Sequence, residues 1–386
     1  MIEIHVEKDL GNFSLNLSLS LQKGLTVLFG PSGSGKTLTL HTISGLVKPD
    51  SGIIRVNGVV YFDKEGGVDL PIHRRQVGYV FQEPSLFPHM TVFENISYGI
   101  SGLPSGERKR RVNDMIERMR LGGLEKNLPH QISGGQKQRV AMGRALAASP
   151  LLLLLDEPFA SLDNPVRGKL RLDLLRIVKE DRTPLIFVTH DVEEAFILAD
   201  EVVVLNDGRV EQTGTKEDIF YRPQTHKVAK FFGVKNIFRG KILDVRPEEG
   251  KMMVWVEQKG FQASIPCRKG AREGEWVRFC IRPEEIMILK EDRPVKKNLK
   301  ANIFTGQILR IVEKGSEHTL FFKQGQNDYD FEISISNLAY RSLGLREGQL
   351  VRVALKWESI WLLPEEKREG STNSWLAAED RNYDWR

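Results

Sequence analysis

The sequence contains almost no cysteine, since Cys267 and Cys280 are the only two among 386 residues. Two thiols make no disulfide framework and their spacing matches no metal motif, so we expect two reduced thiols and a cytosolic location. Long apolar runs are also missing. None is much longer than Leu151–Leu155, whereas a membrane-spanning helix needs about 20 residues. The first residues, Met1–Glu7, alternate as a strand does and do not resemble a signal peptide. We therefore expect any membrane role to be that of a peripheral subunit on the cytoplasmic face.

Basic stretches interleaved with aromatic residues are absent too, so we expect no nucleic-acid partner. The chain is 40% hydrophobic and 28% charged, an ordinary composition for a protein with a sizeable core. Its net charge of +5 is compatible with nucleotide phosphates or an anionic membrane surface and decides neither. The length is sufficient for two domains.

Strands and helices alternate in the first part of the chain. We expect strands within residues 1–30, 151–155 and 185–189, helices at 36–46, 105–120 and 136–148, and a hairpin at 202–212. This alternation predicts a largely parallel α/β core with an antiparallel portion.

The C-terminal part contains an internal repeat. The block Asn236–Leu243 recurs as Asn302–Leu309, and Arg272–Arg278 recurs in the same order as Arg346–Arg352. Glycine-punctuated short strands predict two copies of one small β-barrel. We place this all-β domain at residues 233–364, with repeats at about 236–289 and 302–363, a basic linker at 290–300 and a disordered tail at 365–386.

A glycine-rich segment, Gly30–Thr37, fits the phosphate-loop pattern in full, with a strand before it and a helix after it. Glycines let successive backbone N–H groups face phosphate oxygens, and the helix start adds a partial positive charge. We expect Lys36 to reach the β- and γ-phosphates of ATP and the Thr37 hydroxyl to ligate Mg²⁺. The predicted cradle consists of Gly30, Pro31, Ser32, Gly33, Ser34, Gly35, Lys36 and Thr37. An ordinary glycine turn is the alternative, and pattern and context together count against it.

The apolar strand Leu151–Leu155 leads into two carboxylates. We expect Asp156 to hold Mg²⁺ directly or through water, and Glu157 to polarise the water that attacks the γ-phosphate. Solvated acids at a strand end are the alternative, but a phosphate loop in the same chain favours catalysis.

A second anion-binding helix start is predicted where Ser133, Gly134, Gly135 and Gln136 open a helix. Since the chain already has one phosphate site, a second makes sense as a cap on ATP held by a partner subunit. An ordinary N-cap by Ser133 is the alternative and leaves the pairing unexplained. With this segment, residues 1–232 resemble the ABC-type ATPase family, with Ile132 where leucine is usual.

The resemblance implies further roles. Gln82 corresponds to the glutamine that senses Mg²⁺ and contacts the membrane partner, and Asp163 to the loop that links two ATP sites. His190 corresponds to the switch histidine that contacts the γ-phosphate. Phe13 corresponds to the aromatic that stacks on adenine, although it also fits a strand's apolar face. The implied fold is an α/β P-loop NTPase of ABC type with a helical subdomain at about 83–150, followed by an all-β domain of two oligonucleotide-fold-like barrels.

The family also implies partners. These are a head-to-tail homodimer that sandwiches two ATP molecules, two copies of an integral-membrane permease, and indirectly an extracytoplasmic substrate-binding protein. Residues 82–98 are our candidate for the surface that contacts the permease, and the alternative is that their apolar side chains form the core of the helical subdomain. The duplicated C-terminal domain resembles those of importer ATPases for molybdate, tungstate, sulfate, iron, polyamines and sugars. Details such as Ser336–Gly348 look closest to molybdate/tungstate importers, so an oxyanion bound to this domain is a further expectation.

Two other functional classes remain as alternatives. One is a soluble ABC protein of translation or DNA repair, which generally has two cassettes or a coiled-coil insertion, neither of which is seen here. The other is an oxyanion-binding regulator with a vestigial ATPase. Intact Lys36, Asp156, Glu157 and His190 argue against it.

Overall fold

The computed structural model describes residues 1–22, 24–160, 162–290, 294, 299–325 and 329–364. The chain divides into two compact units, the first made of residues 1–223 and 227–232 and the second of the remaining residues. No helix in the described part of the chain is both long and apolar enough to cross a membrane. The predicted basic linker lies mostly outside the described residues, and the tail at 365–386 lies wholly outside them.

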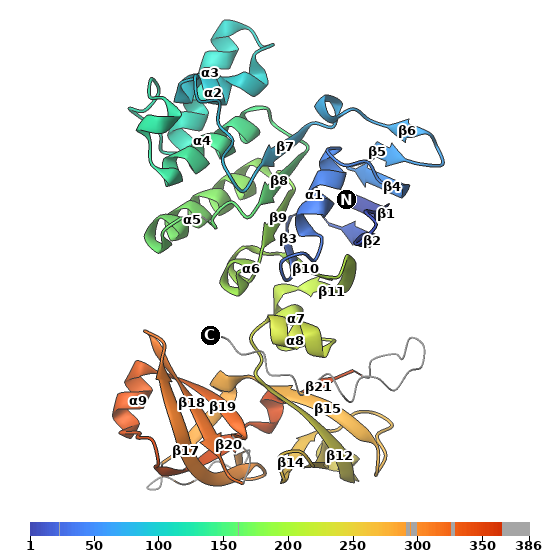
Figure 1. Cartoon of the computed structure of the whole chain (residues 1–386), viewed down its shortest axis with the longest axis vertical. Helices are drawn as coiled ribbons and strands as arrows, with labels where there is room; N and C mark the ends of the chain where they lie inside the picture. The colour runs from blue at the N-terminus through green and yellow to red at the C-terminus, as the bar shows by residue number, and fades with distance from the viewer. Residues whose placement is uncertain (23, 161, 291–293, 295–298, 326–328, 365–386) are drawn as a thin grey trace. The chain divides into compact units, whose positions relative to one another are not determined.

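The first unit is built on a six-stranded sheet with the order β11-β10-β3-β9-β8-β7 (Figure 1). All neighbours are parallel except the β10–β11 hairpin. The bounds are β3 (Leu25–Phe29), β7 (Val77–Val80), β8 (Leu152–Asp156), β9 (Leu185–Thr189), β10 (Glu201–Asn206) and β11 (Arg209–Thr215). Every residue of β3, β8 and β9 is buried. Such uniformly apolar strands are typical of a parallel sheet that is covered on both faces.

One face of this sheet is covered by α1 (Lys36–Ser44) and by a second, antiparallel sheet, β2-β1-β4-β5-β6. In β2 every second residue is buried, as its alternating sequence predicts. The bounds in this sheet are β1 (Ile2–Asp9), β2 (Ser14–Leu21), β4 (Ser51–Val56), β5 (Val59–Asp63) and β6 (Val68–Asp69).

The opposite face is covered by helices, which share one apolar core with it. The helix predicted at 105–120 is α3 (Ser105–Arg118), and it buries Val112, Met115 and Ile116. The helix predicted at 136–148 begins two residues earlier, as α4 (Gly134–Ala147), because Ser133 provides its N-cap. The other helices are α2 (Val92–Ser97), α5 (Asn164–Asp181), α6 (Val192–Leu198), α7 (Lys216–Tyr221) and α8 (His226–Phe231).

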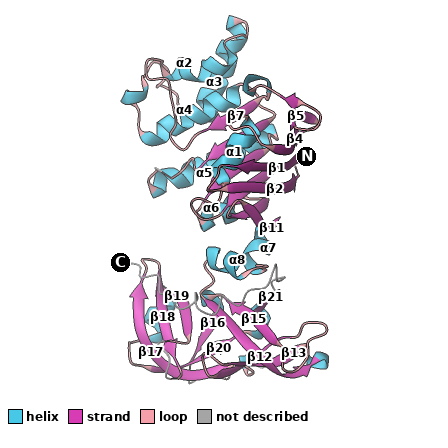
Figure 2. Cartoon of the chain, turned by 45° about the vertical axis from the view of Figure 1, so that its right-hand side comes forward, coloured by secondary structure: helices cyan, strands magenta, loops and turns pink. Residues whose placement is uncertain are grey.

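The second unit consists almost entirely of strands, in two five-stranded sheets (Figure 2). The orders are β14-β13-β12-β15-β21 and β16-β20-β17-β18-β19. Each repeat therefore completes the other's sheet, because β16, from the first repeat, pairs with β20, and β21, from the second, pairs with β15. The bounds are β12 (Asn236–Arg246), β13 (Lys251–Val256), β14 (Phe261–Pro266), β15 (Trp276–Ile281), β16 (Ile286–Leu289), β17 (Ile303–Glu313), β18 (Glu317–Lys323), β19 (Phe331–Ser336), α9 (Asn337–Leu343), β20 (Leu350–Leu355) and β21 (Trp361–Leu363).

The repeated Asn-Ile-Phe motif holds the two repeats together. The Asn236 side chain exchanges two hydrogen bonds of 2.8 Å with the backbone of Glu332 in the other repeat. Its counterpart Asn302 does the same with Ser264, at 2.7 Å. The phenylalanine of the second motif, Phe304, packs 5.2 Å from Phe261 in a core common to both sheets. The structure confirms an α/β fold followed by an all-β region, with the two repeats interlocked.

Candidate functional site

The predicted phosphate loop connects β3 to α1, and two of its glycines stand where no larger residue fits. A Cβ on Gly30 would lie 2.2 Å from the carbonyl oxygen of Leu205 on β10. Gly35 has φ of 98°, and a Cβ there would lie 2.9 Å from Leu15. The loop is thus folded tightly against the neighbouring strands, and the start of α1 is open to an anion.

Lys36 is folded into the loop and is 5% exposed. Its Nζ donates hydrogen bonds of 2.9 Å to the carbonyl oxygens of Gly30 and Pro31. Burial lowers the pKa of this ammonium, and the charges of Glu157 and Asp156 oppose the shift. The ammonium lies within the loop, where phosphate oxygens can replace the carbonyls as acceptors.

Parallel strands bring the other predicted residues to the same edge of the sheet. Asp156 ends β8, His190 directly follows β9, and Gln82 comes two residues after β7. The carboxyl edge of a parallel sheet is where α/β proteins bind their ligands. Gln82 is exposed there.

Asp156 and Thr37 supply the oxygen atoms of a candidate magnesium site. The Thr37 hydroxyl donates to Asp156 Oδ1 at 3.0 Å. Burial raises the pKa of the Asp156 carboxyl, and the hydrogen bond from Thr37 opposes this shift. Among the described residues, no group of three or more His, Cys, Asp or Glu side chains could hold a metal. A hydroxyl and a single carboxylate nevertheless suit Mg²⁺, which takes few protein oxygens together with water and phosphate.

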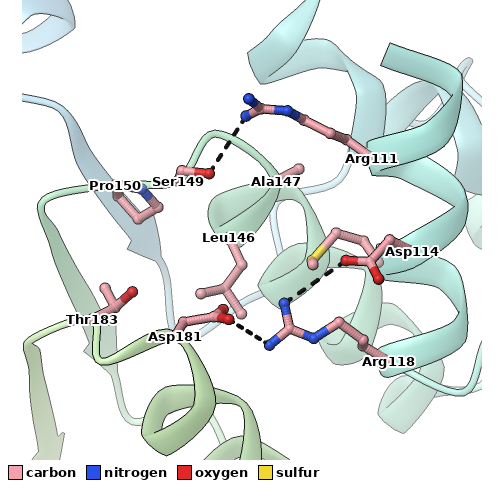
Figure 3. A pocket seen from close by; sticks show the side chains of 10 residues that line it. Arg111, Asp114, Arg118, Leu146, Ala147, Ser149, Pro150, Asp181 and Thr183 are labelled. Atoms are coloured by element: carbon pink, nitrogen blue, oxygen red, sulfur yellow. Dashed lines mark hydrogen bonds and ion pairs between the residues drawn. The ribbon is translucent and has the colours of Figure 1, made fainter. Parts of the chain in front are cut away.

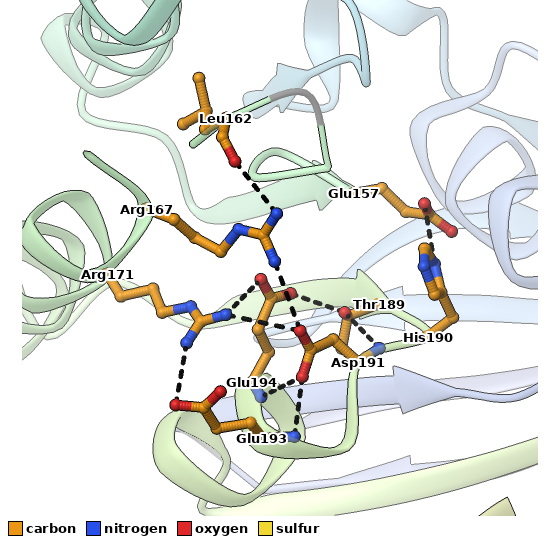
Figure 4. Close-up of polar contacts among 9 residues, drawn as sticks. All are labelled: Glu157, Leu162, Arg167, Arg171, Thr189, His190, Asp191, Glu193 and Glu194. Atoms are coloured by element: carbon orange, nitrogen blue, oxygen red, sulfur yellow. Dashed lines mark hydrogen bonds and ion pairs between the residues drawn. The ribbon is translucent and has the colours of Figure 1, made fainter. Parts of the chain in front are cut away.

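Glu157 and His190 contact each other directly. His190 Nδ1 lies 3.1 Å from Glu157 Oε2 (Figure 4). The Glu157 backbone has φ of 42°, a left-handed conformation that is uncommon outside glycine. Its N–H donates to the carbonyl of Val188 on β9, at 3.1 Å. The carboxylate is therefore held between two strand ends by its backbone and by a histidine.

The second helix start has the predicted cap. Ser133 and Gln136 form a reciprocal capping box at the start of α4. Gly135 is buried, and a Cβ there would lie 2.6 Å from Val166 of α5. Asp163 is exposed and stands at the N-cap position of α5, although its side chain makes no capping hydrogen bond. In the described part of the chain, no hydrogen bond or ion pair joins Ser133–Gln136 to the phosphate loop.

Phe13 lies at the phosphate loop but outside any strand. A Cβ on Gly35 would lie 3.2 Å from its ring, and one on Gly208 would lie 3.1 Å from it. The ring is partly buried against the core of the antiparallel sheet. It is thus placed beside the loop, as a base-stacking residue requires.

One buried residue that contacts the helix behind the phosphate loop gave no signal in the sequence. Arg75, which is 2% exposed, donates from Nη1 to the carbonyls of Thr42 and Ile43, in the last turn of α1, at 3.1 and 2.8 Å. It thereby fixes the far end of the helix that starts at the phosphate loop.

A cavity of about 380 Å³ lies elsewhere in the first unit, among α3 and the ends of α4 and α5 (Figure 3). None of the predicted site residues lines it. Arg118 pairs across it with Asp181 at 2.8 Å, and Arg111 pairs with Glu107 at 2.9 Å. Its arginines are thus engaged with carboxylates of the protein.

Comparison with known proteins shows which family the chain belongs to. A family model described as ABC transporter matches residues 14–160. The sulfate/thiosulfate import ATP-binding protein CysA of Ralstonia nicotianae is 37% identical over 358 residues, which cover 90% of this chain and 92% of that protein. The chain belongs to the ABC transporter family of ATP-binding proteins. As a member of this ABC family, it is a transport ATPase that binds and hydrolyses ATP.

Other ABC relatives carry different cargo names at similar identity. The spermidine/putrescine import protein PotA of Nitratidesulfovibrio vulgaris is 39% identical, covering 78% of this chain and 79% of that protein. The molybdate/tungstate import protein WtpC of Thermococcus kodakarensis is 38% identical, covering 81% and 89%. A solved structure, cbiO1 from Clostridium perfringens, part of the ABC transporter complex cbiONQ, has a TM-score of 0.50 at 27% identity, covering 59% and 92%. The predicted closeness to molybdate/tungstate importers is thus only one of several equal similarities.

Proposed function

We propose that this chain is the ATP-hydrolysing subunit of an ABC importer, and that the residues at the carboxyl edge of its parallel sheet carry out hydrolysis. The observation that supports this most is the arrangement of Lys36, Asp156 and Glu157 around one loop. Lys36 donates to the carbonyls of Gly30 and Pro31, Asp156 accepts from Thr37, and Glu157 contacts His190.

In this proposal the loop Gly30–Thr37 binds the phosphates through backbone N–H groups and the Lys36 ammonium. Glu157 orients and polarises the attacking water, and His190 fixes the Glu157 carboxylate and contacts the γ-phosphate. Thr37, Asp156 and Gln82 would hold Mg²⁺, which neutralises the charge that develops on the phosphate oxygens. Phe13 would stack on the adenine.

The site is incomplete in one chain, so we propose a head-to-tail homodimer. Ser133, Gly134 and Asp163 are exposed at helix starts in the first unit, and the segment Ser133–Gln136 would meet ATP bound to the partner's phosphate loop. Sharing the γ-phosphate between two subunits makes closure depend on ATP and reopening on hydrolysis.

The surface around Gln82 is our candidate for contact with a permease. Asn95, fully buried, holds the preceding loop through hydrogen bonds to Phe87 and Met90. Tyr98 remains 52% exposed beside Phe87. Aromatic residues are enriched at protein–protein interfaces, so an exposed tyrosine beside a well-held loop suits contact with a partner. Placement at the cytoplasmic face of a membrane, and indirect contact with an extracytoplasmic binding protein, follow from this proposal.

For the cargo we propose a tetrahedral oxyanion, with sulfate/thiosulfate ahead of molybdate/tungstate. The match spans about nine-tenths of the length of the sulfate/thiosulfate relative and of the molybdate/tungstate relative, but less of the length of the polyamine relative. Uptake of radiolabelled sulfate and molybdate by cells with and without the gene would test this. Loss of polyamine uptake alone would contradict it.

A direct effect of oxyanion on the C-terminal domain is tested by adding each anion to the whole transporter and measuring ATPase activity.

Hydrolysis is tested with Glu157→Gln, which keeps the size of the side chain but removes its charge and replaces one acceptor oxygen with an NH2 donor. We expect kcat to fall by at least about a hundredfold while ATP still binds. Glu65→Gln, on an exposed side chain between β5 and β6, is the matched control and should keep its activity. Equal activity in the two variants would refute the assignment of Glu157.

A further inference from the structure

Two arginines of α5 contact residues beside the strand end that carries His190, and one of them, Arg167, also contacts the loop that contains Asp163. Arg167 Nη2 donates to the carbonyl of Leu162, one residue before Asp163, at 3.0 Å. Its Nη1 lies 3.6 Å from Asp191, the residue after His190. One guanidinium thus contacts both segments (Figure 4).

Arg171 lies one helical turn further along the same face of α5. Its Nη2 is 2.9 Å from Glu194 Oε1, and both side chains are more than nine-tenths buried. The other oxygen of Glu194 accepts a hydrogen bond of 2.6 Å from Thr189, the residue before His190. Burial strengthens these contacts, because the effective dielectric constant is low there.

The two residues that flank His190, Thr189 and Asp191, are thus both held in place, Thr189 through Glu194 and Asp191 by the arginines, while the His190 side chain itself is 61% exposed and contacts Glu157. Asp191 N donates to Thr189 Oγ1 at 3.0 Å, closing the group around the histidine. Asp191 also caps α6, accepting from Glu193 N and Glu194 N. The backbone on both sides of His190 is therefore linked to α5 and, through Arg167, to the loop that precedes it.

We propose that Arg167 is a positioning residue that couples the Asp163 loop to His190, and that Arg171 supports it by holding Asp191 and Glu194. This rests on the proposed function, in which that loop meets the partner subunit. These contacts are already present in the single chain, so a partner that docks on the Asp163 loop and shifts the Leu162 carbonyl would shift Arg167, Asp191 and the position of His190 beside Glu157. Hydrolysis then reaches its full rate only in the closed dimer.

The test uses Arg167→Ala and Asp191→Asn in the full chain. Asparagine still caps α6, but it lacks the charge that faces Arg167 and Arg171. We expect either change to lower kcat about tenfold, equivalent to about 1.4 kcal/mol, with the KM for ATP within about twofold of the parent value. Arg176→Ala, an exposed arginine of the same helix, is the control and should keep its kcat.

A double-mutant cycle separates coupling from general loosening of the fold. If Arg167 acts through His190, Arg167→Ala should lower kcat by less than about twofold in the His190→Ala background. A full tenfold loss in that background, or a kcat for Arg167→Ala equal to that of Arg176→Ala, would overturn the proposal. Such results leave the proposed function standing, which fails separately if Glu157→Gln remains active.

Discussion

Replacing Arg75 with methionine should destabilise the first unit strongly, because the buried guanidinium satisfies backbone carbonyls that have few other partners. It donates to Leu70 and Ile43 at 2.8 Å and to Thr42 at 3.1 Å. The Thr42 carbonyl keeps a second bond, from Gly45 N–H at 3.3 Å. The change thus removes this donor from three carbonyls and, among the described residues, leaves those of Leu70 and Ile43 unpaired.

Each buried carbonyl left unpaired costs about 1–3 kcal/mol, so we expect a loss of about 2–5 kcal/mol in the free energy of unfolding. Methionine also removes the cost of burying a charge, a cost shown by the lowered pKa of Arg75. The lower end of the range for the loss in free energy of unfolding allows for this gain. For a unit of this size the loss corresponds to a fall in Tm of roughly 5–15 °C.

Differential scanning calorimetry of the full chain would measure the change. Arg74→Met is the matched control, because Arg74 is exposed next to Arg75. A Tm for Arg75→Met within about 1 °C of that of Arg74→Met would refute the reasoning, since two unpaired carbonyls should have a larger effect.

Three further outcomes are expected. Burial raises the pKa of Asp156, so the folded chain binds this proton more tightly than the unfolded chain does, and the stability of the nucleotide-free protein falls as pH rises above the ordinary carboxyl range. Asp156→Asn should therefore raise Tm at pH 7, yet abolish Mg·ATP hydrolysis. An unchanged Tm would count against a destabilising, desolvated carboxylate. Phe13→Ala should raise the KM for ATP about fivefold or more at similar kcat if the ring stacks on adenine, whereas a lower Tm at unchanged KM would assign it to the core. Asn302→Ala should cost about 2–5 kcal/mol in the second unit, because it unpairs both backbone groups of buried Ser264, and calorimetry showing no loss would contradict the interlocking role of the motif.

The sequence allowed much of the site to be predicted, because its residues follow the ends of apolar strands. Parallel pairing of β7, β8, β9 and β3 brings Gln82, Asp156, His190 and the phosphate loop to one edge without further information. Such local motifs need only a strand, a turn and a helix in the right order.

Other features could not be predicted, because they depend on contacts between distant segments. The repeat is visible in the sequence, but the last strands of its two copies, β16 and β21, are alike. Their pattern therefore does not indicate that each pairs with a strand of the other copy. Arg75 and Arg171 look like ordinary charged residues in the sequence. They are buried only because carbonyls of α1 and a carboxylate of α6 meet them in the folded unit.

In the proposed dimer, ATP is held between the phosphate loop of one subunit and the helix start at Ser133 of the other. Analytical ultracentrifugation of Glu157→Gln with Mg²⁺ and ATP tests it most directly. We predict a dimer with ATP, a monomer with ADP, and loss of the dimer when Ser133→Arg is added to the same chain. A Glu157→Gln chain that stays monomeric with ATP, or a dimer that Ser133→Arg leaves intact, would contradict the account.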